Sequence, residues 1–409
     1  MNTPACRKSQ SVIPAQAGIQ KRWIEPLPFP LLTCGALIVP NGILLRLVLV
    51  SLCLLFSGLQ AEMGPYKDSG IPGFVDSDLN PIDPETPGAE VHPVFCRWAT
   101  NWIAYEPAAQ TITPDFTDPQ KALGPVTGKR HDVVSLGDLN QTQINQEFQP
   151  GRITLTFYDD QTGDPNGIIP NGPGNDFAVF ENGFIAALSD AGQGILAGQM
   201  FAELAHVEVS SDNQHFARFP SASLTPTPVG AFGTVEITQV HNLAGKHPNS
   251  NGQSFGTPFD LSDLVDHTLV VNGQVDLAAI RYLRIVDIPG SGNFTDEASV
   301  LTDPETAPLY DAYGFDHPVY DVWHTVGSGG FDLEAVGLMQ EQQYAADINL
   351  DGLVDYRDFQ ILGRTWLSQF GNDAYLFRSD LAQPRDYQVN TADLILFASQ
   401  WLGVELWRE

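Results

Sequence analysis

The stretch from Val207 to Phe219, VEVSSDNQHFARF, combines two patterns from which the fold of this chain can be predicted. Its first half alternates apolar and polar residues, as a strand with one buried face does. Ser211, Asp212 and Asn213 follow, and residues of these types favour tight turns. The stretch therefore predicts a half-buried strand that ends in a turn.

The same pattern recurs along residues 62–342. Short apolar alternations, separated by clusters of Gly, Pro, Asn and Asp, occur at Ile153 to Tyr158, Phe177 to Glu181, His206 to Ser210, Tyr282 to Val286 and Phe331 to Leu338. No long stretch with helical spacing lies between them, whereas parallel strands need helical crossovers. We therefore expect a mainly β fold, an antiparallel β-sandwich, for residues 62–342.

The chain is strongly acidic, because its 409 residues include 49 Asp plus Glu against 20 Lys plus Arg, a formal net charge of -29. Proteins that bind the phosphate backbone need a basic surface, so we expect no nucleic-acid binding. Apolar residues make up 43% of the chain and aromatic residues 10%. These fractions are too high for a disordered acidic chain and predict a packed core.

Residues 43–61, ILLRLVLVSLCLLFSGLQA, have the layout of a secretory signal peptide. We expect a signal peptide at residues 42–61, preceded at residues 1–41 by a leader that does not belong to the folded protein. A membrane anchor or a buried helix is the alternative, although the apolar run is short for a bilayer. Export would make the mature chain a secreted or cell-surface protein with no membrane span and with one cysteine, Cys96.

Between Asp347 and Asp358 the sequence DINLDGLVDYRD carries oxygen-bearing side chains at regular positions. Gly352 allows the sharp turn that such a loop requires, and calcium prefers six to eight oxygen ligands. The predicted calcium ligands are Asp347, Asn349, Asp351, the carbonyl of Leu353, Asp355 and Asp358. We therefore predict a Ca²⁺ site in this loop; a solvated acidic turn is the alternative.

The loop and the helix expected after it are repeated 35 residues later. Val354, Asp355, Asp358, Phe359, Leu362, Trp366 and Leu367 correspond to Val389, Asn390, Asp393, Leu394, Phe397, Trp401 and Leu402. Seven matched pairs, one of them Trp366 with Trp401, indicate an internal duplication. Since the apolar positions of each copy form one helical stripe, residues 343–409 predict two helices that bury their stripes against each other.

The second loop departs from the ligand pattern of the first. Its oxygen donors are Asp380, Asp386, Asn390 and Asp393. Asp380 reaches the first ligand position only with a two-residue insertion, and Tyr387 replaces the turn glycine. We expect the second helix to persist, whereas the second calcium site is the doubtful one of the two.

Residues 346–402 resemble the dockerin family, whose members are paired calcium-loop helices that bind cohesin domains. The resemblance rests on the Asp at position 12 of the loop, the short helix and the repeat itself. It implies an EF-hand-like α-helical pair, bound Ca²⁺ and a cohesin-like partner. The six ligands of the first loop carry over directly, whereas the second loop lacks part of the family's pattern.

Three stretches of the expected sandwich resemble discoidin-like, galactose-binding-like jelly rolls. They are VEVSSDNQHFARF, RYLRIVDI from Arg281 to Ile288, and GGFDLEAVGL from Gly329 to Leu338. In such domains the first stretch is a hairpin and the other two are late strands. Residues 64–338, with KALGPVTG and NDFAVFENGF among their motifs, also resemble a family of exported bacterial cell-surface proteins. That resemblance implies export but no particular reaction.

Two groups of residues are candidate ligand-binding residues. Asp176, Glu181 and Asn182 lie beside a Gly-rich turn, where their oxygens could bind a ligand or stabilise the turn itself. Tyr313, Tyr320 and Trp323 belong to a segment in which aromatic residues lie close to Asp and His in the sequence, a composition typical of sugar-binding sites. Packing of core strands and loops explains the second group equally well.

The leading hypothesis is an exported binding protein that contacts a glycan or another surface component and is attached to a partner by the Ca²⁺-stabilised pair. The alternative is an extracellular carbohydrate-active enzyme of the glycoside hydrolase type, because two catalytic carboxylates need no local motif. A structural role in the cell envelope is a third reading. The sequence contains no nucleophile elbow, zinc-binding helix motif or phosphate loop, so it favours binding over catalysis and points to no catalytic residue.

Overall fold

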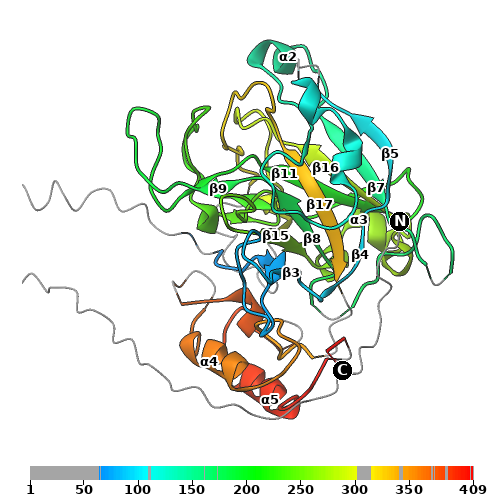
Figure 1. Cartoon of the computed structure of the whole chain (residues 1–409), viewed down its shortest axis with the longest axis vertical. Helices are drawn as coiled ribbons and strands as arrows, with labels where there is room; N and C mark the ends of the chain where they lie inside the picture. The colour runs from blue at the N-terminus through cyan, green and yellow to red at the C-terminus, as the bar shows by residue number, and fades with distance from the viewer. Residues whose placement is uncertain are drawn as a thin grey trace, which may run out of the picture. The chain divides into compact units, whose positions relative to one another are not determined.

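Figure 1 shows the structure, a computed structural model. It describes residues 64, 66–108, 112–160, 162–172, 174–301, 315–339, 344–369, 372, 374–382, 386–405 and 407–408. The expected leader and signal peptide, residues 1–61, lie outside the described residues, as does Tyr313. In this part of the chain, none of the helices has both the length and the apolar character needed to cross a membrane.

One antiparallel sheet has six strands. In spatial order these are β1 (Ile71–Pro72), β15 (Phe255–Phe259), β8 (Phe177–Glu181), β17 (Asp332–Met339) and β4 (Phe95–Trp98), and β6 (Val134–Ser135) also pairs with β17. The long strand β17 thus lies at the centre of the sheet, where every one of its residues is buried.

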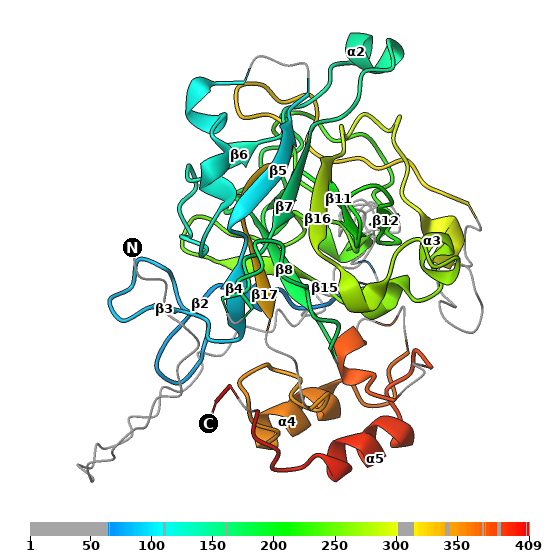
Figure 2. The same ribbon diagram turned by 90° about the vertical axis from the view of Figure 1, so that its right-hand side faces the viewer.

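A second antiparallel sheet has five strands and can be followed in Figure 2. In spatial order they are β12 (Ala217–Arg218), β11 (Ala205–Ser210), β16 (Tyr282–Asp287), β7 (Arg152–Thr156) and β5 (Asn101–Glu106). β11 and β12 form the hairpin expected from VEVSSDNQHFARF, with Asn213 at a φ of 59° in its turn.

Smaller elements connect and flank the two sheets. Two-stranded pairs are β2 (Phe74–Val75) with β3 (Glu90–Val91), β9 (Phe184–Ile185) with β10 (Met200–Phe201), and β13 (Ala222–Ser223) with β14 (Val240–His241). Short α-helices are α2 (Gln141–Asn145) and α3 (Thr268–Val271). Single 3₁₀ turns lie at Pro114–Phe116, Pro119–Ala122, Ile237–Gln239, Leu261–Leu264, Leu277–Ala279, Ala298–Leu301 and Phe377–Ser379.

The two sheets share one hydrophobic core. Val207 of β11 and Ile285 of β16 lie in the same buried cluster as Phe177 of β8 and Leu333 of β17. On the other face of the second sheet, the Arg284 guanidinium lies 3.6 Å from the centre of the Phe216 ring and forms an ion pair with Glu208. The alternation in the sequence therefore separates a core face from a polar face, as predicted. The mainly β, antiparallel class is confirmed, and all five stretches expected to be strands are strands.

The C-terminal segment, residues 344–408, contains two equal helices, α4 (Tyr356–Arg364) and α5 (Thr391–Ser399), each nine residues long. Their first residues are 35 positions apart, which is the period of the sequence repeat. Both start with a capping box, in which the side chain before the helix and the side chain of its third residue bind each other's backbone amides. We call this segment the C-terminal region, and residues 64–339 the sheet region.

The predicted burial of complete helical stripes is only partly correct. Leu362 and Phe397 are buried, but Trp366 and Leu367 lie beyond the end of α4, and Leu367 is 70% exposed. The reason is a backbone turn at Leu367, whose φ of 61° is incompatible with a continuing helix.

Candidate functional site

The two halves of the C-terminal region bind each other through the same reciprocal hydrogen bonds. In one set, Val354 N donates to Gly403 O and Leu402 N donates to Val354 O. In the other set, Val389 N donates to Ser368 O and Leu367 N donates to Val389 O. All four bonds are 2.8 to 2.9 Å long. The two sets are related by the 35-residue shift, so each loop is tied to the segment that follows the other helix. The duplication is therefore a structural repeat in which the halves exchange equivalent contacts.

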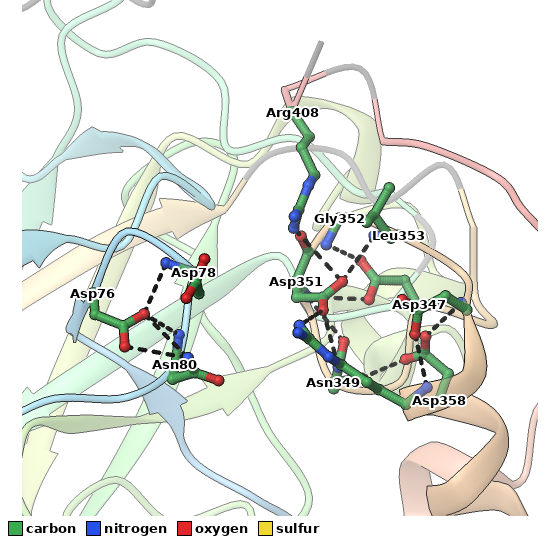
Figure 3. Close-up of polar contacts among 12 residues, drawn as sticks. Asp76, Asp78, Asn80, Asp347, Asn349, Asp351, Gly352, Leu353, Asp358 and Arg408 are labelled. Carbon is green, nitrogen blue, oxygen red and sulfur yellow. Dashed lines mark hydrogen bonds and ion pairs between the residues drawn. The ribbon is translucent and has the colours of Figure 1, made fainter. Parts of the chain in front are cut away.

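The first loop, residues 347–358, winds around its own acidic side chains (Figure 3). The carboxylate of Asp347 accepts hydrogen bonds from the amides of Asp351, at 3.1 Å, and Gly352, at 2.9 Å. That of Asp358 accepts from the amides of Asn349, at 3.0 Å, and Asp355, at 2.9 Å. Gly352 has a φ of 81°, which is the conformation expected of the turn glycine.

Three carboxylates of the first loop are almost completely removed from water. Asp347 is 1% exposed, Asp351 4% and Asp358 0%. Burial, and to a smaller extent the charge of Asp358, raises the pKa of Asp347 to about 8. Burial also raises the pKa of Asp358 to about 6. Buried carboxylates that repel one another in this way favour either protons or a bound cation.

Protein cations act on at least two of the three carboxylates, since the charge of Arg378 lowers the pKa of Asp347 and two arginines pair with Asp351. The Arg357 guanidinium lies 2.9 Å from Asp351 Oδ2, and that of Arg408 lies 3.7 Å from Asp351 Oδ1 and donates to the backbone carbonyl of the same residue. Figure 3 also shows the loop of Asp76, Asp78 and Asn80 from the sheet region beside this group. The charge of Asp78 contributes to raising the pKa of Arg357.

The first loop fits calcium in its residue types, their order and their burial. Asp347, Asn349, Asp351, the Leu353 carbonyl, Asp355 and Asp358 are the residues that would hold the ion. Over the described part of the chain, no group of three or more His, Cys, Asp or Glu side chains is positioned to hold a metal. Since Asp351 is turned toward arginine, binding would require its carboxylate to exchange a guanidinium for the ion. The ion would neutralise the buried charge and cross-link the loop.

The described residues of the second loop, 380–382 and 386–393, repeat features of the first loop with fewer buried acids. Tyr387 has a φ of 57°, so it adopts the conformation that Gly352 has in the first loop. Asp393 is buried and accepts hydrogen bonds from the amides of Leu381, Ala382 and Asn390. Ala382 donates to Asp393 as Asn349 donates to Asp358, so Ala382 is the counterpart of Asn349. Asp380 therefore lies two residues before that counterpart, as Asp347 lies two residues before Asn349.

The remaining donors of the second loop already have protein partners. The Asp380 carboxylate accepts a hydrogen bond from the Tyr375 hydroxyl at 3.0 Å. Asp386 is exposed and accepts from the side chain of Asn390 at 2.7 Å and from the amide of Gln388 at 3.0 Å. The second loop therefore offers an ion a weaker set of oxygens than the first.

Asp176 holds two backbone segments together. Its carboxylate is 4% exposed and accepts hydrogen bonds from the amides of Gly172 and Leu261, both at 2.7 Å. Burial raises its pKa to about 8. The structure thus places Asp176 inside the sheet region, where it fixes the turn before β8 to the end of β15.

The other candidate ligand residues lie in two places. Glu181 is 2% exposed and accepts from the amide of Gly183, while Asn182 donates to the carboxylate of Asp332 at 3.2 Å. The half-buried indole of Trp323 donates to the carbonyl of Leu139 at 3.0 Å. Tyr320 is also half-buried, and its ring lies where a side chain at position 292 would stand.

Glu181 belongs to a group of buried carboxyls that sequence reasoning missed. Its members, each 2 to 5% exposed, are Asp138, Glu181, Glu203, Asp287, Asp321 and Asp332. The hydroxyl of Thr325 lies 3.2 Å from Asp138 Oδ2 and 2.8 Å from Glu203 Oε1, which joins two members. Burial raises the pKa of Asp138 and of Asp332 to about 7. We call this group the buried acid cluster.

The members of the buried acid cluster are far apart in the sequence, so no local motif marks them. One signal was available, because Glu181 occupies an inward position of the strand FAVFE, where an apolar residue is expected.

No protein-family model matches the chain, and no curated protein matches it. The functional argument therefore rests on the geometry of the described residues.

Proposed function

We propose that this chain is an exported binding protein whose C-terminal region is a calcium-stabilised, dockerin-like attachment module. In this proposal the two sheets are a galactose-binding-like sandwich that contacts a glycan or another surface component. The observation that carries the proposal is the first loop, in which three carboxylates with at most 4% exposure lie within twelve residues. A divalent cation would relieve their repulsion, and oxygen-rich loops of this kind bind Ca²⁺.

Two further features support an attachment role. The reciprocal hydrogen bonds make the two halves equivalent, which agrees with the paired loop-helix design of the family that the sequence resembles. Apolar side chains beyond the helices are left in contact with water, with Leu367 70% and Leu402 69% exposed. Exposed apolar side chains at matching places of both halves suit a protein partner, and a cohesin-like domain is the one that the resemblance implies.

Calcium binding is tested by isothermal titration calorimetry on the intact chain. We expect one tight site, lost in Asp358→Asn, because that change removes a buried ligand charge. Asp393→Asn is the matched control, since Asp393 has the same place in the second loop and the same capping role. Binding that survives Asp358→Asn but disappears in Asp393→Asn would assign the ion to the other loop, and no binding at millimolar Ca²⁺ would refute the module.

The binding role of the sheet region is tested separately on a glycan array, followed by an assay for released reducing sugar. Retention of a glycan without sugar release supports the proposal. Sugar release that is lost on substitution of a single Asp or Glu would instead identify a glycoside hydrolase. A cohesin panel in the presence of Ca²⁺ or chelator tests the attachment partner, and the proposal requires capture only with Ca²⁺.

A further inference from the structure

The apolar residues of the first loop alternate with its ligands and contact the sheet region. Asp347, Asn349 and Asp351 are predicted ligands, and Ile348 and Leu350 stand between them. Ile348 is 3% exposed and Leu350 2% exposed. One short segment thus carries both predicted ligands and buried apolar side chains.

Leu350 belongs to a hydrophobic cluster that otherwise consists of residues from the sheet region. Its neighbours in that cluster include Ile71 of β1, Phe95 of β4 and Met339 of β17. Ile348 lies in a second cluster, which joins the helical pair to Tyr66 and to other residues of the sheet region. The calcium loop is thus itself part of the contact surface.

Glu405 and Trp407 also contact the first loop. The amide of Glu405 donates to the carbonyl of Gly352 at 2.9 Å, and the Glu405 carboxylate accepts from the amide of Tyr344 at 2.9 Å. The indole of Trp407 lies so close to Gly352 that a Cβ there would be 2.9 Å from it. The same indole lies 6.2 Å from the ring of His92, in the sheet region.

We infer that an ion in the first loop fastens the C-terminal region to the sheet region, because three of the predicted ligands and the apolar residues that pack toward the sheet region belong to the same five residues, 347–351. The inference rests on the calcium binding proposed above. It makes Ca²⁺ a regulator of the joint between the two parts of the chain. By thermodynamic linkage, the contact with the sheet region tightens Ca²⁺ binding as much as Ca²⁺ tightens the contact.

Hydrogen–deuterium exchange of the intact chain, with Ca²⁺ or with chelator, tests this joint. We expect Ca²⁺ to slow exchange in the C-terminal region and also in β4 and β17, whose residues Phe95 and Met339 belong to the same hydrophobic cluster as Leu350. The hairpin of β11 and β12, which has no residue in the Leu350 cluster, should be unaffected. This measurement needs no substitution and so does not depend on the folding of a variant.

Leu350→Gly provides the second measurement. Leu350 has a φ of 57°, a conformation that glycine adopts easily, so the change removes the contact and leaves every ligand in place. We expect Ca²⁺ binding weaker by about tenfold and loss of the Ca²⁺ effect on β4. Leu367→Gly is the matched control, because Leu367 has a φ of 61° but is 70% exposed.

The outcomes separate the joint from the site itself. If the intact chain binds no Ca²⁺, the proposed site fails and the joint fails with it. If Ca²⁺ binds but slows exchange only within residues 344–408, the site stands and the joint is refuted. Unchanged Ca²⁺ affinity in Leu350→Gly, together with an undiminished effect on β4, also refutes it.

Discussion

Asp332 allows a quantitative test of the protonation of the buried acid cluster. Its side chain is 2% exposed on β17, and burial raises its pKa from 3.8 to about 7. Between these two values the folded protein keeps a proton that the unfolded chain has released, so the free energy of unfolding falls as the pH rises. One retained proton changes that free energy by about 1.4 kcal/mol per pH unit, hence by about 4 kcal/mol from pH 4 to pH 7.

Asp332→Asn replaces the carboxyl by a neutral amide that can still accept the hydrogen bond from Asn182. The variant should lose this part of the pH dependence. Urea unfolding of both proteins from pH 4 to pH 8 measures the difference, which should grow in favour of the variant by about 1.4 kcal/mol per pH unit and level off above pH 7. The stability contributed by the protonated carboxyl is thus present at acid pH and lost as the pH rises through 7.

The difference between the two proteins reports Asp332 together with its effect on its neighbours, because the charge of Asp332 raises the pKa of Glu203 and of Asp287. The charge of Asp138 also raises the pKa of Glu203 and of Asp287. Val336→Ala, in the same buried strand, is the control, since its cost should not depend on pH. Parallel stability curves for the wild type and Asp332→Asn would refute a protonated carboxyl at this position.

Two further predictions concern packing and charge. Lys246 is 1% exposed, donates to the carbonyl of Tyr66 at 3.1 Å and pairs with Asp68. Lys246→Met should therefore lower the free energy of unfolding in urea by about 3 kcal/mol. A loss below about 1 kcal/mol would contradict the role of this pair. Phe397 is 2% exposed, so Phe397→Ala should lower the stability of the C-terminal region, measured by amide exchange, by about 3 to 5 kcal/mol. The control is Ile395→Ala, at a side chain 67% exposed, which should change that stability by less than about 0.5 kcal/mol. Equal effects of the two substitutions would refute the idea that burial of Phe397 stabilises the C-terminal region.

Strand positions were predictable because each strand carries its own signal. In β16, Leu283 and Ile285 enter the core while Arg284 stays on the polar face, and this period of two is visible in the sequence. The nine-residue helices were equally predictable from their capping residues and their repeat. Contacts between distant segments carry no such signal, so the pairing order of the strands and the buried acid cluster emerged only from the structure.

The joint between the two parts of the chain did leave a trace in the sequence. In DINLD, the residues between the ligands are Ile348 and Leu350, although a loop exposed to water would carry polar residues there. The predicted ligands alone indicate only a separate pair of helices at residues 343–409. Attention to the apolar residues between the ligands would have predicted that this loop is covered.

The second loop shows why an aspartate at position 12 is weak evidence for a bound ion. Asp358 and Asp393 both cap a helix and both bind amides at the start of their own loops, so either carboxylate is needed for the fold even without calcium. The two loops differ in the other carboxylates that could bind an ion together with the aspartate at position 12. The first loop offers Asp347 and Asp351, both buried, although Asp351 is paired with Arg357 and Arg408. The second offers Asp380, which is bound by Tyr375, and an exposed acid. Selection for folding alone would therefore preserve Asp393, whereas the buried acids at the start of the first loop are the ones whose charge a bound cation would neutralise.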